Sequence, residues 1–179
     1  MPSLKVRQAI PSDIDSVMAV EVEAFDPLIR ETRDTFLERM ASFPDGFFVL
    51  EADGMVSGYA CTELWRRKPC PEPSDFALGH RISERHRRDG DELYVSSFAV
   101  LGSLRGTGSG KYLWTELVRI ADDSIRPASW ILLVAEKWSN AIALYAKSGF
   151  EEIARLPSFF AFGDGTACDG LVMRREPRW

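Results

Sequence analysis

The stretch Phe98-Ala-Val-Leu-Gly-Ser-Leu-Arg-Gly-Thr-Gly-Ser-Gly-Lys111 indicates how this chain folds. It begins in an apolar, β-rich segment, 93–100, which predicts a buried strand, and it leads into a helical pattern over 111–122. Glycines between the two elements let the backbone approach an anion closely. The unpaired N–H groups and the dipole of the first helical turn attract negative charge, so this turn predicts a phosphate or pyrophosphate site.

Two common phosphate-binding motifs do not fit the turn. A P-loop would need glycine at Arg105 and serine or threonine at Tyr112. The dinucleotide fingerprint would need a third glycine at Lys111. The pattern that does fit is Arg105-x-x-Gly108-x-Gly110.

Outward from this turn, the chain reads as alternating strands and helices. Asp53-Gly54 is typical of a hairpin turn, which makes the two flanking strands antiparallel. A strand–turn–helix–strand–helix order after that hairpin predicts a mixed α/β sheet. The predicted strands are 4–9, 47–51, 55–65, 93–100, 130–135, 150–156 and 168–174, and the predicted helices lie between Ser12 and Pro27 and over 32–43, 111–122 and 140–147.

Composition limits the class of protein. With 179 residues, the chain suits a single domain, 1–179, interrupted by a long polar insert at about 66–91. The net charge of −5 argues against a sequence-independent nucleic-acid binder. Two histidines and three scattered cysteines predict neither a metal site nor a disulfide framework. The absence of a signal peptide and of a long apolar run predicts a cytoplasmic protein without a membrane partner.

Two motifs together resemble the GNAT superfamily of N-acetyltransferases. Arg105-x-x-Gly108-x-Gly110 is similar to its acyl-CoA pyrophosphate loop. The later segment from Asn140 to Phe150, with Tyr145 five residues after Asn140, resembles its second signature. The order of predicted elements matches over nearly the whole chain, so the resemblance implies a mostly antiparallel central sheet with helices on both faces.

The resemblance also implies roles for particular residues. The strand end at Phe98, Ala99 and Val100 would offer backbone groups to the pantetheine arm, and Asn140 would hydrogen-bond the same region. Tyr145 would protonate the departing CoA thiolate, unless it is simply a core aromatic. The pyrophosphate would be held by a run of residues in the loop: Arg105, Gly106, Thr107, Gly108, Ser109, Gly110 and Lys111.

The general base is less clearly indicated. Strand alternation predicts that Glu92, Tyr94, Ser96 and Phe98 share one face. Superfamily enzymes often carry an acid or histidine eleven residues before the loop arginine, where this chain has Tyr94. We rank Glu92 first as a base acting through water, and the other candidates are Glu63, Tyr94, His80 and His86.

The sequence indicates only the chemical class of the acceptor. Glu21-Val-Glu-Ala-Phe25 and the segment 93–100 resemble the arylalkylamine N-acetyltransferase branch, although that branch has a His-x-His pair where this chain has Tyr94 and Ser96. The insert at 66–91 precedes the catalytic strand, so we expect it to shape the acceptor pocket, with a solvated charged face as the alternative.

The resulting hypothesis is an acetyl-CoA-dependent N-acyltransferase that acts on the primary amine of a small molecule without a metal. Protein or peptide acetylation and a non-catalytic acyl-CoA-binding module are the alternatives. The sequence leaves open the identity of the amine, the acyl length and the oligomeric state, a homodimer included.

Overall fold

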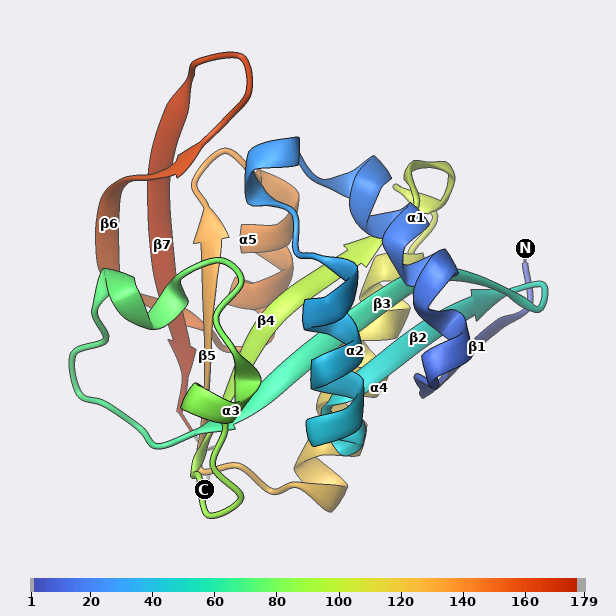
Figure 1. Ribbon diagram of the computed structural model, residues 1–179, viewed down its shortest axis with the longest axis horizontal. Helices are drawn as coiled ribbons and strands as arrows, with labels where there is room; N and C mark the ends of the chain where they lie inside the picture. The colour runs from blue at the N-terminus through green and yellow to red at the C-terminus, as the bar shows by residue number, and fades with distance from the viewer. Residues whose placement is uncertain (1, 177–179) are drawn as a thin grey trace.

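The computed structural model describes residues 2–176, so residues 1 and 177–179 of the predicted domain lie outside the described part. Its strands form one seven-stranded sheet in the order β1-β2-β3-β4-β5-β7-β6 (Figure 1). Only β4 and β5 pair in parallel, and every other neighbouring pair is antiparallel. This confirms the predicted mixed, mostly antiparallel sheet. The strands are β1 (Leu4–Gln8), β2 (Phe47–Ala52), β3 (Met55–Trp65), β4 (Glu92–Val100), β5 (Ser129–Ala135), β6 (Glu151–Ala161) and β7 (Ala167–Arg175).

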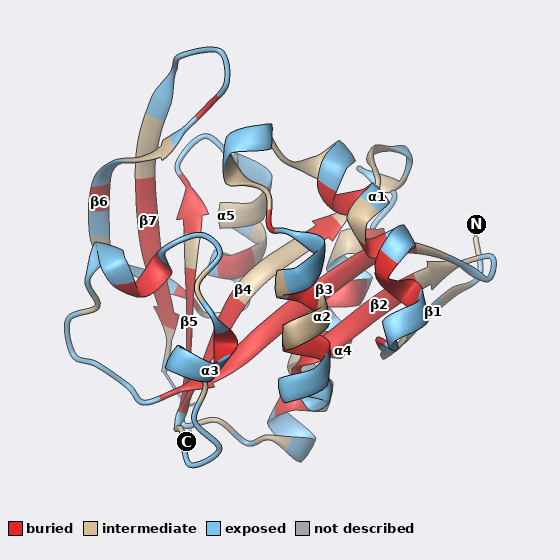
Figure 2. Ribbon diagram, in the orientation of Figure 1, coloured by how far each residue is buried: buried red, intermediate tan, exposed pale blue. Residues whose placement is uncertain are grey.

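Helices cover both faces of the sheet because its central strands are apolar on both sides. On β2, Phe47 and Val49 pack in one core cluster, and Phe48 and Leu50 pack in another. Side chains of α1 and α2 belong to the first cluster, and side chains of α4 and α5 belong to the second. Figure 2 shows the buried strands between the helix layers. The helices are α1 (Ile14–Ala24), α2 (Arg33–Ser42), α3 (Ile82–Arg85), α4 (Ser109–Ser124) and α5 (Ser139–Lys147).

A β-bulge in β4 corrects the predicted alternation. Val95 lies opposite Thr62 and Ser97 lies opposite Cys61, so Ser96 is an extra residue in β4. An extra residue reverses the faces beyond it. Phe98 therefore packs on the α4 side, whereas Tyr94 and Ser97 face the α1–α2 side, and the predicted common face of Glu92, Tyr94, Ser96 and Phe98 is wrong.

The insert at 66–91 folds against the α2 side of the sheet. It contains a 3₁₀ turn, η4 (Pro73–Phe76), and the short helix α3 (Figure 1). Its far end is fixed by backbone hydrogen bonds, in which Arg87 donates to Leu64 at 2.7 Å and Asp91 donates to Trp65 at 2.9 Å. Inside the insert, the Asp75 carboxylate accepts from Lys68 and Arg85.

No helix in residues 2–176 is long and apolar enough to cross a membrane. The cytoplasmic location stays a prediction.

Candidate active site

A cavity of about 1160 Å³ opens where β4 and β5 separate. The two strands pair only from Glu92 to Val95 on β4 and from Ser129 to Leu132 on β5. Beyond that point, residues 95–100 of β4 and 132–134 of β5 line the cavity. The backbone of β4 has no strand partner on this side, so its polar groups are available to a ligand.

One end of the cavity is built for anions. Gly106 and Gly108 have φ of 77° and 90°, a conformation that favours glycine, and Gly108 caps α4. The backbone N–H groups of Gly110 and Lys111 have no acceptor within the described chain. Basic side chains face the same cavity: Arg105, Lys111, Lys137 and Lys147. This end of the cavity suits a polyphosphate.

Most of the predicted cofactor residues line this cavity: Phe98, Ala99, Val100, Arg105, Gly106, Gly108, Gly110, Lys111 and Asn140. Thr107 and Ser109 do not. Their hydroxyls share a hydrogen bond of 2.8 Å, and the Thr107 hydroxyl also bonds the Leu104 carbonyl. Lys137 and Lys147 also line the cavity and were missed by sequence reasoning. The Lys137 Nζ lies 2.9 Å from the centroid of the Phe162 ring in the β6–β7 hairpin.

Tyr145 lies on α5 where that helix meets the cavity. Its ring packs on Trp114 at a centroid distance of 4.8 Å and on Phe150 at 6.1 Å. Burial raises the pKa of the Tyr145 phenol, so the group keeps its proton at neutral pH. The side chain therefore packs in the core and presents a protonated phenol at the cavity wall.

The structure corrects the ranking of Glu92 as the base. Glu92 is buried at the beginning of β4 and does not line the large cavity. Its carboxylate accepts from Arg174 Nε at 2.7 Å and from the Ser129 hydroxyl at 2.8 Å. Because a buried arginine and a serine hydroxyl occupy this carboxylate away from the cavity, Glu92 is not available as a base there.

Apolar side chains from three separate segments form the opposite end of the cavity. They are Phe25, Leu28 and Ile29 after α1, Phe76 and Leu78 from the insert, and Phe159 and Phe160 from β6. The insert therefore lines the apolar end of the cavity, and its role in shaping an acceptor pocket stays a prediction.

A contact between two of these segments bridges the cavity. The Asp26 carboxylate accepts from the Gly163 N–H at 3.1 Å, which joins the α1–α2 connection to the β6–β7 hairpin. Beside it, Trp138 packs between Phe25 and Phe160 at centroid distances of 5.6 and 5.5 Å. We call this contact, made by Asp26, Gly163, Phe25, Trp138 and Phe160, the bridge.

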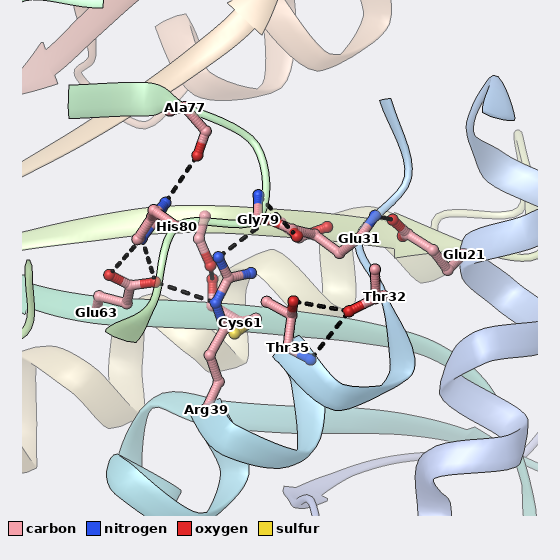
Figure 3. A network of polar contacts seen from close by, with 12 residues as sticks. Glu21, Glu31, Thr32, Thr35, Arg39, Cys61, Glu63, Ala77, Gly79 and His80 are labelled. Carbon is pink, nitrogen blue, oxygen red and sulfur yellow. Dashed lines mark hydrogen bonds and ion pairs between the residues drawn. The ribbon is translucent and has the colours of Figure 1, made fainter. Parts of the chain in front are cut away.

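A buried polar network holds the insert beside the apolar end of the cavity (Figure 3). His80 Nε2 lies 2.9 Å from both carboxylate oxygens of Glu63, and its Nδ1 lies 2.9 Å from the Ala77 carbonyl. Arg39 lies between Glu63 and Glu31, at 3.1 and 3.0 Å. This network ties the insert to α2, β3 and the α1–α2 connection.

The same contacts argue against His80 and Glu63 as free bases. Burial favours the neutral imidazole, but the hydrogen bond and charge of Glu63 outweigh burial and raise the pKa of His80. Both ring nitrogens face acceptors, which suits the doubly protonated ring. Burial likewise opposes ionisation of Glu63, yet His80 and Arg39 together lower its pKa.

Of the remaining two candidates, Tyr94 lines the cavity and His86 does not, and neither is suited to act as a base. His86 does not line the cavity, and its Nδ1 accepts from the Leu64 N–H at 3.2 Å. Tyr94 stacks on Trp65 at 3.9 Å, and burial raises the pKa of its phenol, which opposes the phenolate that a base would need.

Glu21 is a cavity carboxylate that sequence reasoning did not single out. It is only 1% exposed, and burial raises its pKa despite the Tyr59 hydroxyl and the Glu31 N–H, which both donate to it. The signal was present, because Glu21 falls on the apolar stripe of its helix with Val17 and Met18. A charged residue at such a position is a candidate for function.

Comparisons with known proteins agree with this geometry. A profile of the acetyltransferase (GNAT) family matches residues 14–150. A Sulfurisphaera tokodaii N-alpha-acetyltransferase is 26% identical over 162 residues, which cover 89% of this chain and 87% of that protein.

Solved structures give the same fold. A ribosomal-protein-alanine N-acetyltransferase from Brucella melitensis is 26% identical, with a TM-score of 0.69 over 97% of this chain and 99% of that one. A GNAT-like decarboxylase in complex with isobutyryl-CoA has a TM-score of 0.77 at 18% identity, over 97% of this chain and 100% of that one.

Proposed function

The chain belongs to the acetyltransferase (GNAT) family and is an N-acetyltransferase, and from this premise we propose that it transfers an acetyl group from acetyl-CoA to the primary amine of a small, apolar molecule. The observation that carries the choice of acceptor is the apolar end of the cavity. The insert, Phe25, Trp138 and Phe160 line that end, and the carboxylates that line the cavity are Glu21 and Glu31.

The other end of the cavity fits the donor. The N–H groups at the beginning of α4, with Arg105 and Lys111 in the same turn, match the phosphates of CoA. The unpaired edge of β4 matches the amide groups of a pantetheine arm, which would run along it as an extra strand. Bound there, acetyl-CoA supplies an acetyl thioester, an acyl group already activated toward an amine.

The chain's own residues then assist the transfer. Backbone N–H groups at the end of β4 stabilise the oxyanion that develops on the acetyl carbonyl oxygen when the amine attacks the acetyl carbon. Tyr145, protonated because it is buried, donates to the sulfur as the carbon–sulfur bond breaks. A free alkylamine is mostly protonated at neutral pH, so the acidic acceptor end attracts the ammonium form, and a base must then remove one proton.

The experiment is release of free thiol from acetyl-CoA, followed with a panel of acceptors. We expect small amines with an apolar body to have the highest kcat/KM, and short hydrophilic amines to react poorly because they leave the apolar walls unfilled. Transfer to hydrophilic amines alone would contradict the proposed acceptor class.

A second candidate is acetylation of a peptide α-amine. It is favoured by the similarity to the N-alpha-acetyltransferase of Sulfurisphaera tokodaii. The same assay separates the two candidates, since peptides would then exceed every small amine. The bridge favours the small amine, because it joins the α1–α2 connection to the β6–β7 hairpin and an extended chain could not pass between them while it holds.

A further inference from the structure

The bulge in β4 brings three side chains from three elements into one hydrogen-bonded chain. Tyr59 of β3 donates its hydroxyl to Glu21 of α1, and its oxygen lies 2.6 Å from the Ser97 hydroxyl of β4. Ser97 and Glu21 both line the cavity, whereas Tyr59 is fully buried behind them.

The hydrogen bonds among Ser97, Tyr59 and Glu21 all run in one direction, from donor to acceptor. A phenol has one hydrogen, and that of Tyr59 is committed to the carboxylate of Glu21. The hydrogen between Ser97 and Tyr59 therefore belongs to Ser97. The Ser97 oxygen is then left with lone pairs to accept a proton from the cavity, and every donor in the chain points toward Glu21.

The position of Ser97 at the cavity wall connects these three hydrogen-bonded side chains to the site of acetyl transfer. Ser97 directly precedes the segment of β4 along which we place the pantetheine arm, and it is half-buried at the cavity wall. Without the bulge at Ser96, strand alternation would turn Ser97 away from Tyr59.

We propose that Ser97, Tyr59 and Glu21 form a proton relay that deprotonates the acceptor amine. This proposal rests on the proposed N-acetyltransferase function. One N–H proton of the ammonium passes to the Ser97 oxygen, the Ser97 proton passes to Tyr59, and the Tyr59 proton passes to Glu21. The ammonium becomes a neutral amine, the carboxylate becomes a carboxylic acid, and no other bond changes. Glu21 later returns the proton to solvent.

Ser97 is the catalytic residue of the relay, since it touches the amine, and Tyr59 and Glu21 act through it. The charged and titratable groups facing Glu21 are Glu31 from the α1–α2 connection, Arg39 from α2, and Tyr59 and Cys61 from β3. Glu31 opposes ionisation of Glu21 and Arg39 favours it, but burial is the largest influence and raises the pKa of Glu21. A carboxyl with a raised pKa is a stronger proton acceptor nearer neutral pH.

The test is the pH profile of kcat/KM for acetyl transfer to phenethylamine, measured for wild type and for Ser97→Ala, Tyr59→Phe and Glu21→Gln. We expect each variant to lose about 10²-fold at neutral pH, the usual scale of a general base. The loss shrinks as the pH approaches the pKa of the amine, near 10, where the amine is already neutral. Because the three groups act as a unit, Ser97→Ala/Glu21→Gln loses no more than either single variant.

Thr62→Val is the matched control. It removes another buried hydroxyl of β3, one that donates to the Gly46 carbonyl at 2.9 Å away from the cavity. We expect it to lower the melting temperature and leave the pH profile unchanged. If Glu21→Gln does not fold, Ser97→Ala and Tyr59→Phe still decide the question, because each removes a single oxygen.

Two outcomes overturn the relay. One is a folded Ser97→Ala enzyme whose kcat/KM stays within about threefold of wild type at every pH. The other is a double variant, Ser97→Ala/Glu21→Gln, whose loss of kcat/KM equals the product of the losses in the two single variants, as is expected for independent structural defects. If wild type acetylates peptides and not phenethylamine, the acceptor class is wrong, and the same variants test the relay on a peptide. A wild type that acetylates neither overturns both proposals.

Discussion

Replacing Tyr145 with phenylalanine separates its two roles in the structure. The Tyr145 hydroxyl has no hydrogen-bond partner in residues 2–176, and the ring contacts to Trp114 and Phe150 do not involve it. Tyr145→Phe therefore keeps the packing, and we expect the free energy of unfolding to change by no more than about 0.5 kcal/mol. Removal of the whole ring by Tyr145→Ala would instead cost about 3–5 kcal/mol.

The catalytic effect of the same change follows from the proton that is lost. General acid catalysis contributes about 10²–10⁴-fold, and a thiolate is already a fair leaving group, so we expect kcat to fall by about 10²-fold. That fall is about 2.7 kcal/mol of transition-state stabilisation. The dissociation constant for acetyl-CoA should change little, because the glycine turn and the β4 edge hold the phosphates and the pantetheine arm.

The assay is steady-state kinetics beside calorimetric CoA binding, with Tyr112→Phe as the control. Tyr112 is 37% exposed on α4 and does not line the cavity, so its loss should leave kcat unchanged. If Tyr145→Phe retains full kcat in an assay limited by chemistry, Tyr145 is core packing only.

Three further changes probe the ends of the cavity. Gly108→Asp should weaken CoA binding at least tenfold, about 1.4 kcal/mol, by calorimetry, whereas Gly54→Asp, at a similar positive φ in the β2–β3 hairpin, should not; equal losses would refute the anion site. His80→Gln should raise the KM of the acceptor and leave CoA affinity within a few-fold; the reverse pattern would place the insert on the cofactor side. Because folding raises the pKa of His80, its stabilisation is complete below the ordinary value of 6.5 and is lost as the pH rises through the folded pKa, so denaturant unfolding across pH should show this slope in wild type and not in His80→Gln. Asp26→Ala should raise kcat/KM for peptides relative to small amines by opening the bridge, and an unchanged ratio would mean that the bridge does not select acceptors.

Local pattern was enough to predict most of the fold. Strand 55–65 and the hairpin at Asp53-Gly54 occur as predicted, because turn chemistry and apolar alternation act within a few residues. The anion-binding turn was predictable for the same reason. Its glycines, its helix N-terminus, Arg105 and Lys111 are local features of one segment, whereas Lys137 and Lys147 come from other parts of the chain and were not predicted.

The prediction of Glu92 as the general base failed because the availability of a carboxylate depends on partners that lie far away in the sequence. Glu92 looked free on a predicted strand, but Arg174, 82 residues later, occupies its carboxylate. His80 and His86 looked like solvated charges in a polar insert. Only the fold shows that His80 is held against Glu63 and Ala77 while His86 faces Leu64.

The sequence by itself determined the mixed sheet, the glycine turn at the beginning of α4 and the position of Tyr145 after Asn140, since each follows from residue types at short spacing. Tertiary structure alone decided which carboxylate meets the cavity. The contact between Ser97 and Tyr59 depends in addition on one extra residue at Ser96, because a bulge reverses the faces of a strand and no periodicity in the sequence reports it. By turning Ser97 toward Tyr59 and Glu21, the bulge brings together groups 38 residues apart at each link.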